Sequence, residues 1–157
     1  VRIEHKPRIA MMFNDLFRKR EKDNVSGAVF LVISCIICFA AFDYWVAVVA
    51  LFMAVLGDLF AAIVGKCFGK TPLFKNKTIL GTFAGFAANL IAGILILPKL
   101  PYLIIPMAIV ATVTELITNK IDDNLTVPLF AGFVGQMMVY FFQLELPAVD
   151  FTFLGLF

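Results

Sequence analysis

The chain has 157 residues, of which 62% are hydrophobic and 15% charged, and its mean hydropathy is +0.97. Soluble chains carry about 25% charged residues, so this composition excludes a disordered chain and an ordinary globular domain, and it predicts a protein embedded in a lipid bilayer. Thirteen Lys and Arg against eleven Asp and Glu leave a net charge of +2, a surplus too small to indicate nucleic-acid binding.

Residues 1–24 form a basic segment ahead of the first apolar run. Seven of the thirteen Lys and Arg precede Gly27, and apolar residues interleave with these charges over residues 7–24. This pattern predicts a cytosolic segment with a short interfacial helix on anionic headgroups. A charge cluster that only fixes the topology is an equally good interpretation. The sequence starts at Val1 with no visible signal peptide, so we expect that part of the protein precedes it.

Five apolar segments follow, each close to the length of about 20 residues that a helix needs to cross a bilayer core. They cover residues 26–42, 44–65, 79–97, 102–118 and 127–146. Short turns that are polar or contain proline separate them. The predicted fold class is therefore all-α, with residues 25–157 forming a polytopic membrane bundle of about five transmembrane helices.

The positive charges are distributed unevenly across these predicted spans. With five spans, residues 1–26, the loop 66–78 and the loop 119–125 lie on one side of the membrane. That side holds twelve of the thirteen Lys and Arg, and Lys99 alone lies on the other side. The positive-inside rule then places the N-terminus and both loops in the cytosol.

Two acidic residues lie inside the predicted spans, where an ionisable side chain costs a few kcal/mol. Asp58 lies eight residues before Lys66, and Glu115 lies seven residues before Asp122. At 1.5 Å per residue, both lie about 10 to 12 Å below the cytosolic surface. A protonated carboxyl that only joins helices would explain either residue alone. Two carboxylates at the same depth favour a functional site that opens to the cytosol.

A stripe of small residues shares one face of the helix with the first of these carboxylates. At 100° per residue, the residues on this face are Asp58, Ala61, Ala62, Gly65 and Gly69. A strip without large side chains admits the close approach of either another backbone or a ligand.

Lysines crowd the loop that follows this stripe. Lys66, Lys70, Lys75 and Lys77 precede Thr78, which lies at the start of the next predicted helix. Lysines, exposed backbone N–H groups and a helix N-terminus are the groups with which proteins hold phosphate, although the sequence contains no Walker A pattern. Small-residue packing combined with topogenic lysines is the alternative interpretation of this segment alone.

Acidic and amide side chains lead into the other predicted cytosolic loop and continue through it. Glu115, Asn119, Asp122 and Asp123 recur at helical spacings, so their side chains can line one face. Carboxylates opposite a lysine-rich loop suit Mg²⁺ with the phosphate chain of a nucleotide, because Mg²⁺ prefers one or two carboxylates together with phosphate oxygens.

Three further features predict helix capping and helix contacts. The turn at residues 122–124 can cap the following helix, with Pro128 inside its first turn, in addition to a role in binding. A second stripe, which consists of Gly81, Gly85, Asn89 and Gly93, predicts a helix contact face. Gln136 is expected to form a hydrogen bond across the bundle.

Four motifs, taken in order, resemble one known family. Residues 57–70 read G-D-L-F-A-A-I-V-G-K-C-F-G-K and are similar to the signature of the CTP-dependent lipid-alcohol kinases, which include dolichol kinase, phytol kinase and the CTP-using diacylglycerol kinase. The other motifs are R-E-K-D-N-V-S-G-A-V-F at residues 20–30, Lys77-Thr78 with Gly81, and Glu115 with D-D-N-L-T-V-P-L at residues 122–129. The family pattern has Glu where this sequence has Leu80.

The resemblance implies an integral membrane enzyme that transfers the γ-phosphate of CTP to the hydroxyl of a long-chain lipid alcohol, with Mg²⁺ or another divalent cation. It implies catalytic roles for Asp58, Glu115 and Asp123, and metal binding by Asp58, Asp122 and Asp123. The nucleotide-binding residues that it implies are Gly57, Gly65, Lys66, Gly69, Lys70, Lys77, Thr78 and Asn124. Members also carry an Arg-Lys-rich element and further spans ahead of these motifs, so a fragment without activity of its own is an alternative.

Three other functions stay open. A CTP:phosphatidate cytidylyltransferase would use the same nucleotide and a membrane lipid, but would release pyrophosphate. A cation-coupled transporter would use Asp58 and Glu115, although such sites favour the midplane between inverted repeats. A non-catalytic membrane anchor would bind no CTP. The residues do not distinguish among dolichol, phytol and diacylglycerol as substrates, and they leave self-association open.

Overall fold

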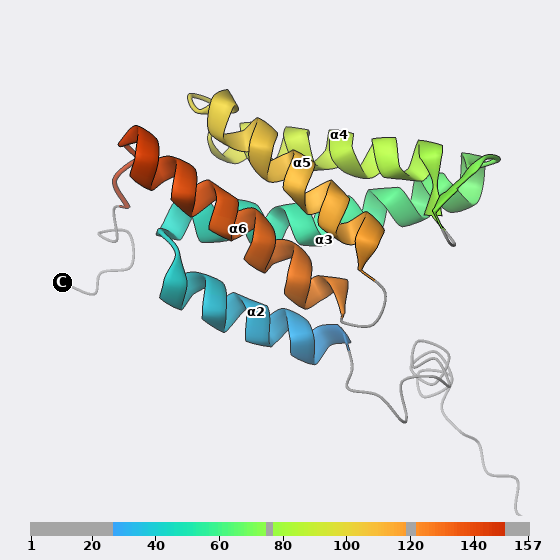
Figure 1. Cartoon of the computed structure of the whole chain (residues 1–157), viewed down its shortest axis with the longest axis horizontal. Helices are drawn as coiled ribbons and strands as arrows, with labels where there is room; N and C mark the ends of the chain where they lie inside the picture. The colour runs from blue at the N-terminus through green and yellow to red at the C-terminus, as the bar shows by residue number, and fades with distance from the viewer. Residues whose placement is uncertain (1–26, 75–76, 119–121, 150–157) are drawn as a thin grey trace, which may run out of the picture.

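The computed structural model describes residues 27–74, 77–118 and 122–149, which form a helical bundle with one short hairpin (Figure 1). The helices are α2 (Gly27–Ala41), α3 (Tyr44–Phe68), α4 (Ile79–Ile96), α5 (Pro101–Ile117) and α6 (Asp123–Phe142). The hairpin strands are β1 (Pro72–Phe74) and β2 (Lys77–Thr78). The interfacial helix predicted within residues 1–24 lies outside the described residues.

Each predicted span coincides with one helix, which confirms the all-α class and the membrane bundle. Helices α3, α4 and α6 are long and apolar enough to cross a bilayer, and α2 and α5 are shorter apolar helices of 15 and 17 residues. Helices form here because a segment in lipid must satisfy its backbone N–H and C=O groups internally. Large apolar side chains such as Phe83 and Leu95 stay exposed on the outside of the bundle, where lipid replaces water as the solvent.

The largest difference from the predicted boundaries is at α6, which begins and ends four residues earlier than the predicted span 127–146. Its polar first turn is stable because the side chain of Asp122 caps it: Oδ1 accepts the Asn124 N–H at 2.9 Å. The expectation that Pro128 lies in the first turn is wrong, since Pro128 is the sixth residue of the helix. The helix ends before Gln143, which has the left-handed φ of 49° that is typical of helix C-termini.

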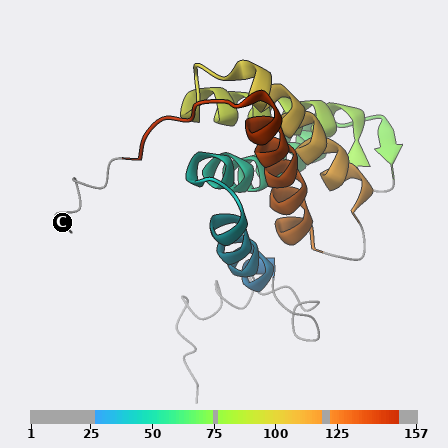
Figure 2. The same cartoon turned by 60° about the vertical axis from the view of Figure 1, so that its left-hand side comes forward.

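Helix α3 is the centre of the bundle and contacts the other four helices. Figures 1 and 2 show α4 and α5 side by side, with α6 lying over α3 and between α5 and α2. The apolar core forms where α3, α5 and α6 meet, and its large buried side chains include Met53, Leu103, Ile104 and Met107. These residues belong to the first half of α3 and of α5, so the heavily packed core occupies one end of the bundle.

A pair of hydrogen bonds near the packed end links α6 to the start of α3. The Asp43 N–H donates to Gln136 Oε1, and Gln136 Nε2 donates to Asp43 Oδ2, each at 2.8 Å. The predicted hydrogen bond of Gln136 across the bundle is therefore confirmed.

Helices α3 and α4 pack closely through the predicted stripe that begins at Gly81. A Cβ on Gly81 would lie 2.8 Å from the Ala61 carbonyl oxygen and 3.0 Å from the Gly65 Cα, so only glycine permits this approach. Farther along α4, the buried Asn89 donates Nδ2 to Thr112 Oγ1 of α5 at 3.1 Å. The prediction of a contact face is confirmed, and the small residues of α3 admit a neighbouring backbone.

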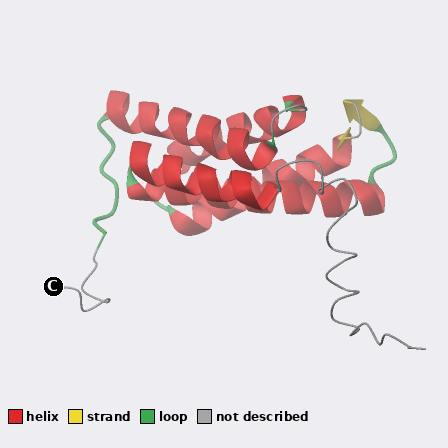
Figure 3. Ribbon diagram, turned by 90° about the horizontal axis from the view of Figure 1, so that it is seen from below, coloured by secondary structure: helices red, strands yellow, loops and turns green. Residues whose placement is uncertain are grey.

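A small antiparallel hairpin joins α3 to α4, within the predicted loop 66–78. Pro72 pairs with Thr78, and the Ile79 N–H donates to the Thr71 carbonyl at 3.1 Å. Strands of three and two residues are too short to show the alternation that predicts a strand. The hairpin lies at one end of the bundle (Figure 3), and the start of α2, the end of α5 and the start of α6 lie at the same end (Figure 1). We call this the hairpin end.

Candidate functional site

Residues of α3, β2, α4 and α5 line an open cavity of about 270 Å³ at the hairpin end, which we call the polar cavity. Its lining residues are Asp58, Ala61, Ala62, Gly65 and Lys66 of α3, Lys77 and Thr78 of β2, Gly81 and Thr82 of α4, and Glu115 of α5. The two carboxylates that were predicted at a common depth, Asp58 and Glu115, therefore border the same space. Three of the predicted phosphate-binding residues, Lys66, Lys77 and Thr78, border it as well.

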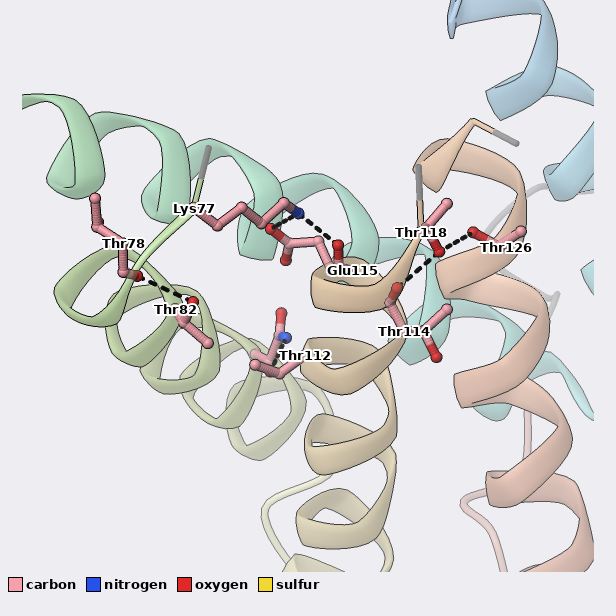
Figure 4. Close-up of polar contacts among 9 residues, drawn as sticks. Lys77, Thr78, Thr82, Thr112, Thr114, Glu115, Thr118 and Thr126 are labelled. Atoms are coloured by element: carbon pink, nitrogen blue, oxygen red, sulfur yellow. Dashed lines mark hydrogen bonds and ion pairs between the residues drawn. The ribbon is translucent and has the colours of Figure 1, made fainter. Parts of the chain in front are cut away.

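An ion pair across the polar cavity links β2 to α5 (Figure 4). Lys77 Nζ lies 2.9 Å from Glu115 Oε1 and donates a second bond of 2.6 Å to the Glu115 carbonyl oxygen. The Glu115 side chain is 7% exposed and that of Lys77 is 31% exposed. A carboxylate buried to this degree needs a cationic partner to stay charged, and a cation also suits the carbonyl end of a helix. Lys77 is therefore fixed between the cavity and the last turn of α5.

Thr78 caps α4 beside this ion pair. Its Oγ1 accepts the Gly81 N–H at 3.2 Å. Thr82 Oγ1 donates to the Thr78 carbonyl at 3.1 Å (Figure 4). Gly65 of α3 leaves room for this cap, because a Cβ there would lie 3.1 Å from Thr78 Oγ1. The first turn of α4 thus borders the cavity next to a lysine, and the N-terminus of a helix favours an anion.

Asp58 is the exposed carboxylate of the polar cavity. Its charge acts on both the Glu115 and the Asp123 carboxyls, so it lies within electrostatic reach of both. Asp123, the first residue of α6, also lies within reach of the Lys77 charge, although it does not line the cavity. The three residues predicted as catalytic therefore gather at the hairpin end, and two of them line the cavity.

Asp122 and Asn124 face the junction of α2 and α6. Asp122 Oδ1 accepts the Asn124 N–H at 2.9 Å and Asn124 Nδ2 at 2.8 Å. A Cβ on Gly27, the first residue of α2, would lie 3.1 Å from Asn124 Nδ2 and 3.3 Å from Asp122 Oδ2. The predicted capping role of this turn is confirmed. Metal binding by Asp122 and nucleotide binding by Asn124 stay predictions.

The remaining predicted site residues lie at the margins of the cavity or outside it. Lys66 borders the cavity and is exposed, and Lys70 is exposed without being part of the lining. Gly57 of α3 lies against the Asn89 side chain in the middle of α4, and Gly69, which follows the end of α3, lies against Thr78 at the start of α4. Leu80, at the position where the family pattern has Glu, is 47% exposed on α4 and does not line the cavity.

Two features formed by threonines were not predicted from the sequence: one lines the polar cavity, and the other joins α5 to α6. Thr82 lines the cavity, and its position one helical turn after the cap of α4 was the available signal. The Thr118 and Thr126 hydroxyls lie 3.2 Å apart and tie the end of α5 to the start of α6 (Figure 4). No local pattern marks that pair, because the two residues meet only through the fold. Lys75 and Asn119, two other residues singled out in the sequence, lie outside the described residues.

The carboxylates at the hairpin end are the groups with which this site could hold a divalent cation. Among the described residues, no group of three or more His, Cys, Asp or Glu side chains is close enough together to hold a metal ion. Asp122 is engaged in the cap of α6, whereas the Asp123 carboxyl lies within electrostatic reach of the Asp58 charge at the hairpin end. Mg²⁺ takes one or two carboxylates and completes its shell with phosphate oxygens and water, so metal binding by Asp58 or Asp123 together with phosphate stays a prediction.

Comparison with known proteins identifies the family. Residues 19–144 match the Cytidylyltransferase family. The chain belongs to this family. A protein of Triticum aestivum named probable phytol kinase, chloroplastic, is 34% identical over 139 residues, which are 76% of this chain and 46% of that protein. CTP-dependent diacylglycerol kinase 1 of Eremothecium gossypii is 33% identical over 79 residues, which are 49% of this chain and 25% of that protein.

Within the family, this chain is thus similar to proteins named as lipid kinases. One relative is named for phytol and the other for CTP and diacylglycerol, which confirms the resemblance drawn from the four motifs. The chain spans less than half the length of each of these relatives. No solved structure matches the chain.

Proposed function

We propose that residues 25–157 carry the catalytic site of a CTP-dependent lipid-alcohol kinase. The observation that carries the proposal is the polar cavity, where the Asp58 carboxylate, the Lys77–Glu115 pair and the first turn of α4 border one space. The names of the two relatives support the same activity. Phosphoryl transfer requires positioning and neutralisation of phosphate charge more than covalent chemistry by the protein, and this cavity offers groups of that kind.

The phosphate chain of CTP binds, in this proposal, between Lys66, Lys77 and the first turn of α4. Glu115 holds the Lys77 ammonium at 2.9 Å, so this cation is in position before the ligand arrives, and preorganised charge lowers the cost of reaching the transition state. Lys66 is exposed at the margin of the cavity and can turn toward the terminal phosphate. Lys70, exposed farther out, adds to the positive potential that attracts the nucleotide.

Asp58 and Asp123 divide the remaining chemistry. We assign Mg²⁺ to Asp123 together with phosphate oxygens, where the ion would supply charge neutralisation for the β- and γ-phosphates. Asp58 is exposed in the cavity and accepts the proton of the lipid hydroxyl. The hydroxyl oxygen forms a bond to the γ-phosphorus while the bond from that phosphorus to the β–γ bridging oxygen breaks, and CDP leaves. Glu115 is a positioning residue that acts through Lys77.

We also propose that the polar cavity opens to the cytosol. The hairpin end carries Lys66, Lys70 and Lys77, whereas Lys99 lies in the turn between α4 and α5 at the other end. The excess of positive charge on one side supports the cytosolic assignment of that side. This orientation would give the site access to cytosolic CTP, while the acceptor stays in the bilayer.

The experiment that tests the function measures the transfer of a radioactive label from the nucleotide to the lipid. Full-length protein in detergent receives Mg²⁺, a mixture of dolichol, phytol and diacylglycerol, and either γ-labelled CTP, γ-labelled ATP or α-labelled CTP. We expect label in lipid from γ-labelled CTP alone, and we expect Asp58→Asn to lose it. Asp43→Asn is the matched control, because Asp43 is an exposed carboxylate at the opposite end of α3. Unchanged transfer by Asp58→Asn would remove the proposed role of this residue.

A CTP:phosphatidate cytidylyltransferase is the second candidate, because the matched family is named for cytidylyl transfer. Such an enzyme would attach the CMP portion of CTP to phosphatidate and release pyrophosphate. The same assay with added phosphatidate distinguishes the two, since α-labelled CTP would then label the lipid and γ-labelled CTP would not. A transporter is less well supported, because Asp58 and Glu115 border a cavity at one end of the bundle and coupled transporters bind ions near the midplane.

A further inference from the structure

An apolar groove lies next to the polar cavity, between the hairpin, α4 and α5. Its volume is about 270 Å³. Its lining residues are Leu73 of β1, Ile79, Thr82, Phe83 and Phe86 of α4, and Thr112 of α5. Both threonines already donate their hydroxyl hydrogens to backbone carbonyls one helical turn earlier. The groove therefore presents mainly hydrocarbon to an occupant.

Thr82 joins this groove to the polar cavity, because it lines both spaces. Its two neighbours in sequence divide between them, with Gly81 on the polar cavity and Phe83 on the groove. A molecule that lies in the groove with its polar end at Thr82 would bring that end to the edge of the space that contains Asp58 and Lys77.

The groove also faces outward from the bundle. Phe83 is 67% exposed, and Leu73 and Ile79 are exposed as well. Helix α4 is long and apolar enough to cross a membrane, and the groove lies along its first two turns, so lipid borders this surface. Lipid tails are as apolar as the side chains that they cover. What distinguishes this groove from other lipid-facing surface is its junction with a polar cavity.

We propose that this groove holds the part of the lipid alcohol's hydrocarbon chain next to the hydroxyl, and that the hydroxyl passes Thr82 into the polar cavity. This inference rests on the proposed function and adds the place where the acceptor binds. The acceptor enters sideways from the bilayer, between the hairpin and α5. The hydrocarbon chain of the lipid alcohol moves from one apolar medium, the bilayer, to another, the groove. The groove therefore determines the position of the alcohol more than its binding affinity. Phe83 and Phe86 then select among alcohols by the shape of their first carbons.

Two other cavities lack this junction. A larger apolar groove of about 350 Å³ lies between α2 and α3 and includes Phe52. A cavity of about 380 Å³ lies at the opposite end of the bundle, around Lys99 and Glu145. Neither shares a lining residue with the polar cavity. A lipid alcohol bound in either place would not adjoin the polar cavity that contains Asp58.

The first test needs no turnover. Full-length protein in nanodiscs is irradiated, without nucleotide, in the presence of phytol or diacylglycerol analogues that carry a diazirine close to the hydroxyl, and mass spectrometry locates the adducts. We expect adducts on Leu73, Phe83 or Phe86, reduced by an excess of the unmodified alcohol. Adducts centred on Phe52, or spread evenly over the lipid-facing surface, would overturn the proposal.

The second test compares two truncations on the lipid-facing surface. Phe83 and Phe52 are 67% and 52% exposed, so neither Phe83→Ala nor Phe52→Ala removes a core side chain. We expect Phe83→Ala to lower kcat/KM for the lipid alcohol about three- to tenfold and to leave the KM for CTP unchanged, with Phe52→Ala at the wild-type level. An equal effect of both variants contradicts the proposal. Absence of transfer in the wild type would refute the proposed function instead, and the adduct positions would still decide what the groove holds.

Discussion

At the residue scale, the Lys77–Glu115 pair places a buried carboxylate and its cation side by side at the polar cavity. Lys77→Met would leave a carboxylate that is 7% exposed without its cation, whereas Glu115→Gln keeps an acceptor for Lys77 and removes the buried negative charge. We expect Lys77→Met to lower the free energy of unfolding by about 2–4 kcal/mol and Glu115→Gln by about 1 kcal/mol. Thermal unfolding in one detergent compares the two, and the double variant should recover most of the loss. Equal losses in the two single variants would contradict this account.

At the scale of the elements, Asp122 both begins α6 and is a predicted metal ligand, and two substitutions separate these roles. Asp122→Asn keeps an effective cap without the charge, and Asp122→Ala removes the cap, which costs about 1 kcal/mol. Asp122 Oδ1 already accepts two hydrogen bonds from Asn124. We therefore expect Asp122→Asn to match the wild type in melting temperature and in the transfer of the γ-phosphate from CTP to the lipid alcohol. Asp122→Ala should lower the melting temperature. Loss of transfer in a stable Asp122→Asn protein would show that the carboxylate binds metal or nucleotide.

At the scale of the whole molecule, the number and order of the helices within residues 27–149 followed from hydropathy, because a segment that crosses lipid must be a continuous apolar run. The contact face that begins at Gly81 was also predictable, since a four-residue spacing is a local property of a helix. The hairpin was not, because its strands are too short for periodicity. The predicted topology brought Lys77 and Glu115 toward the same membrane surface, but these residues are 38 positions apart. Which lysine meets the carboxylate depends on packing that no local pattern encodes.

The orientation of the whole molecule is testable with the chain's own cysteines. Cys67 is exposed at the hairpin end, whereas Cys38 is buried and Cys35 is partly buried in α2. With Cys35→Ala and Cys38→Ala, a membrane-impermeant maleimide should label Cys67 only from the cytosolic face, where most lysines and arginines are predicted. Lys99→Cys, made with Cys67→Ala, should be labelled from the other face, since α4 separates the two positions. Labelling of both positions from one face would mean that α4 does not cross the membrane. Labelling with the faces exchanged would place the polar cavity away from the cytosol.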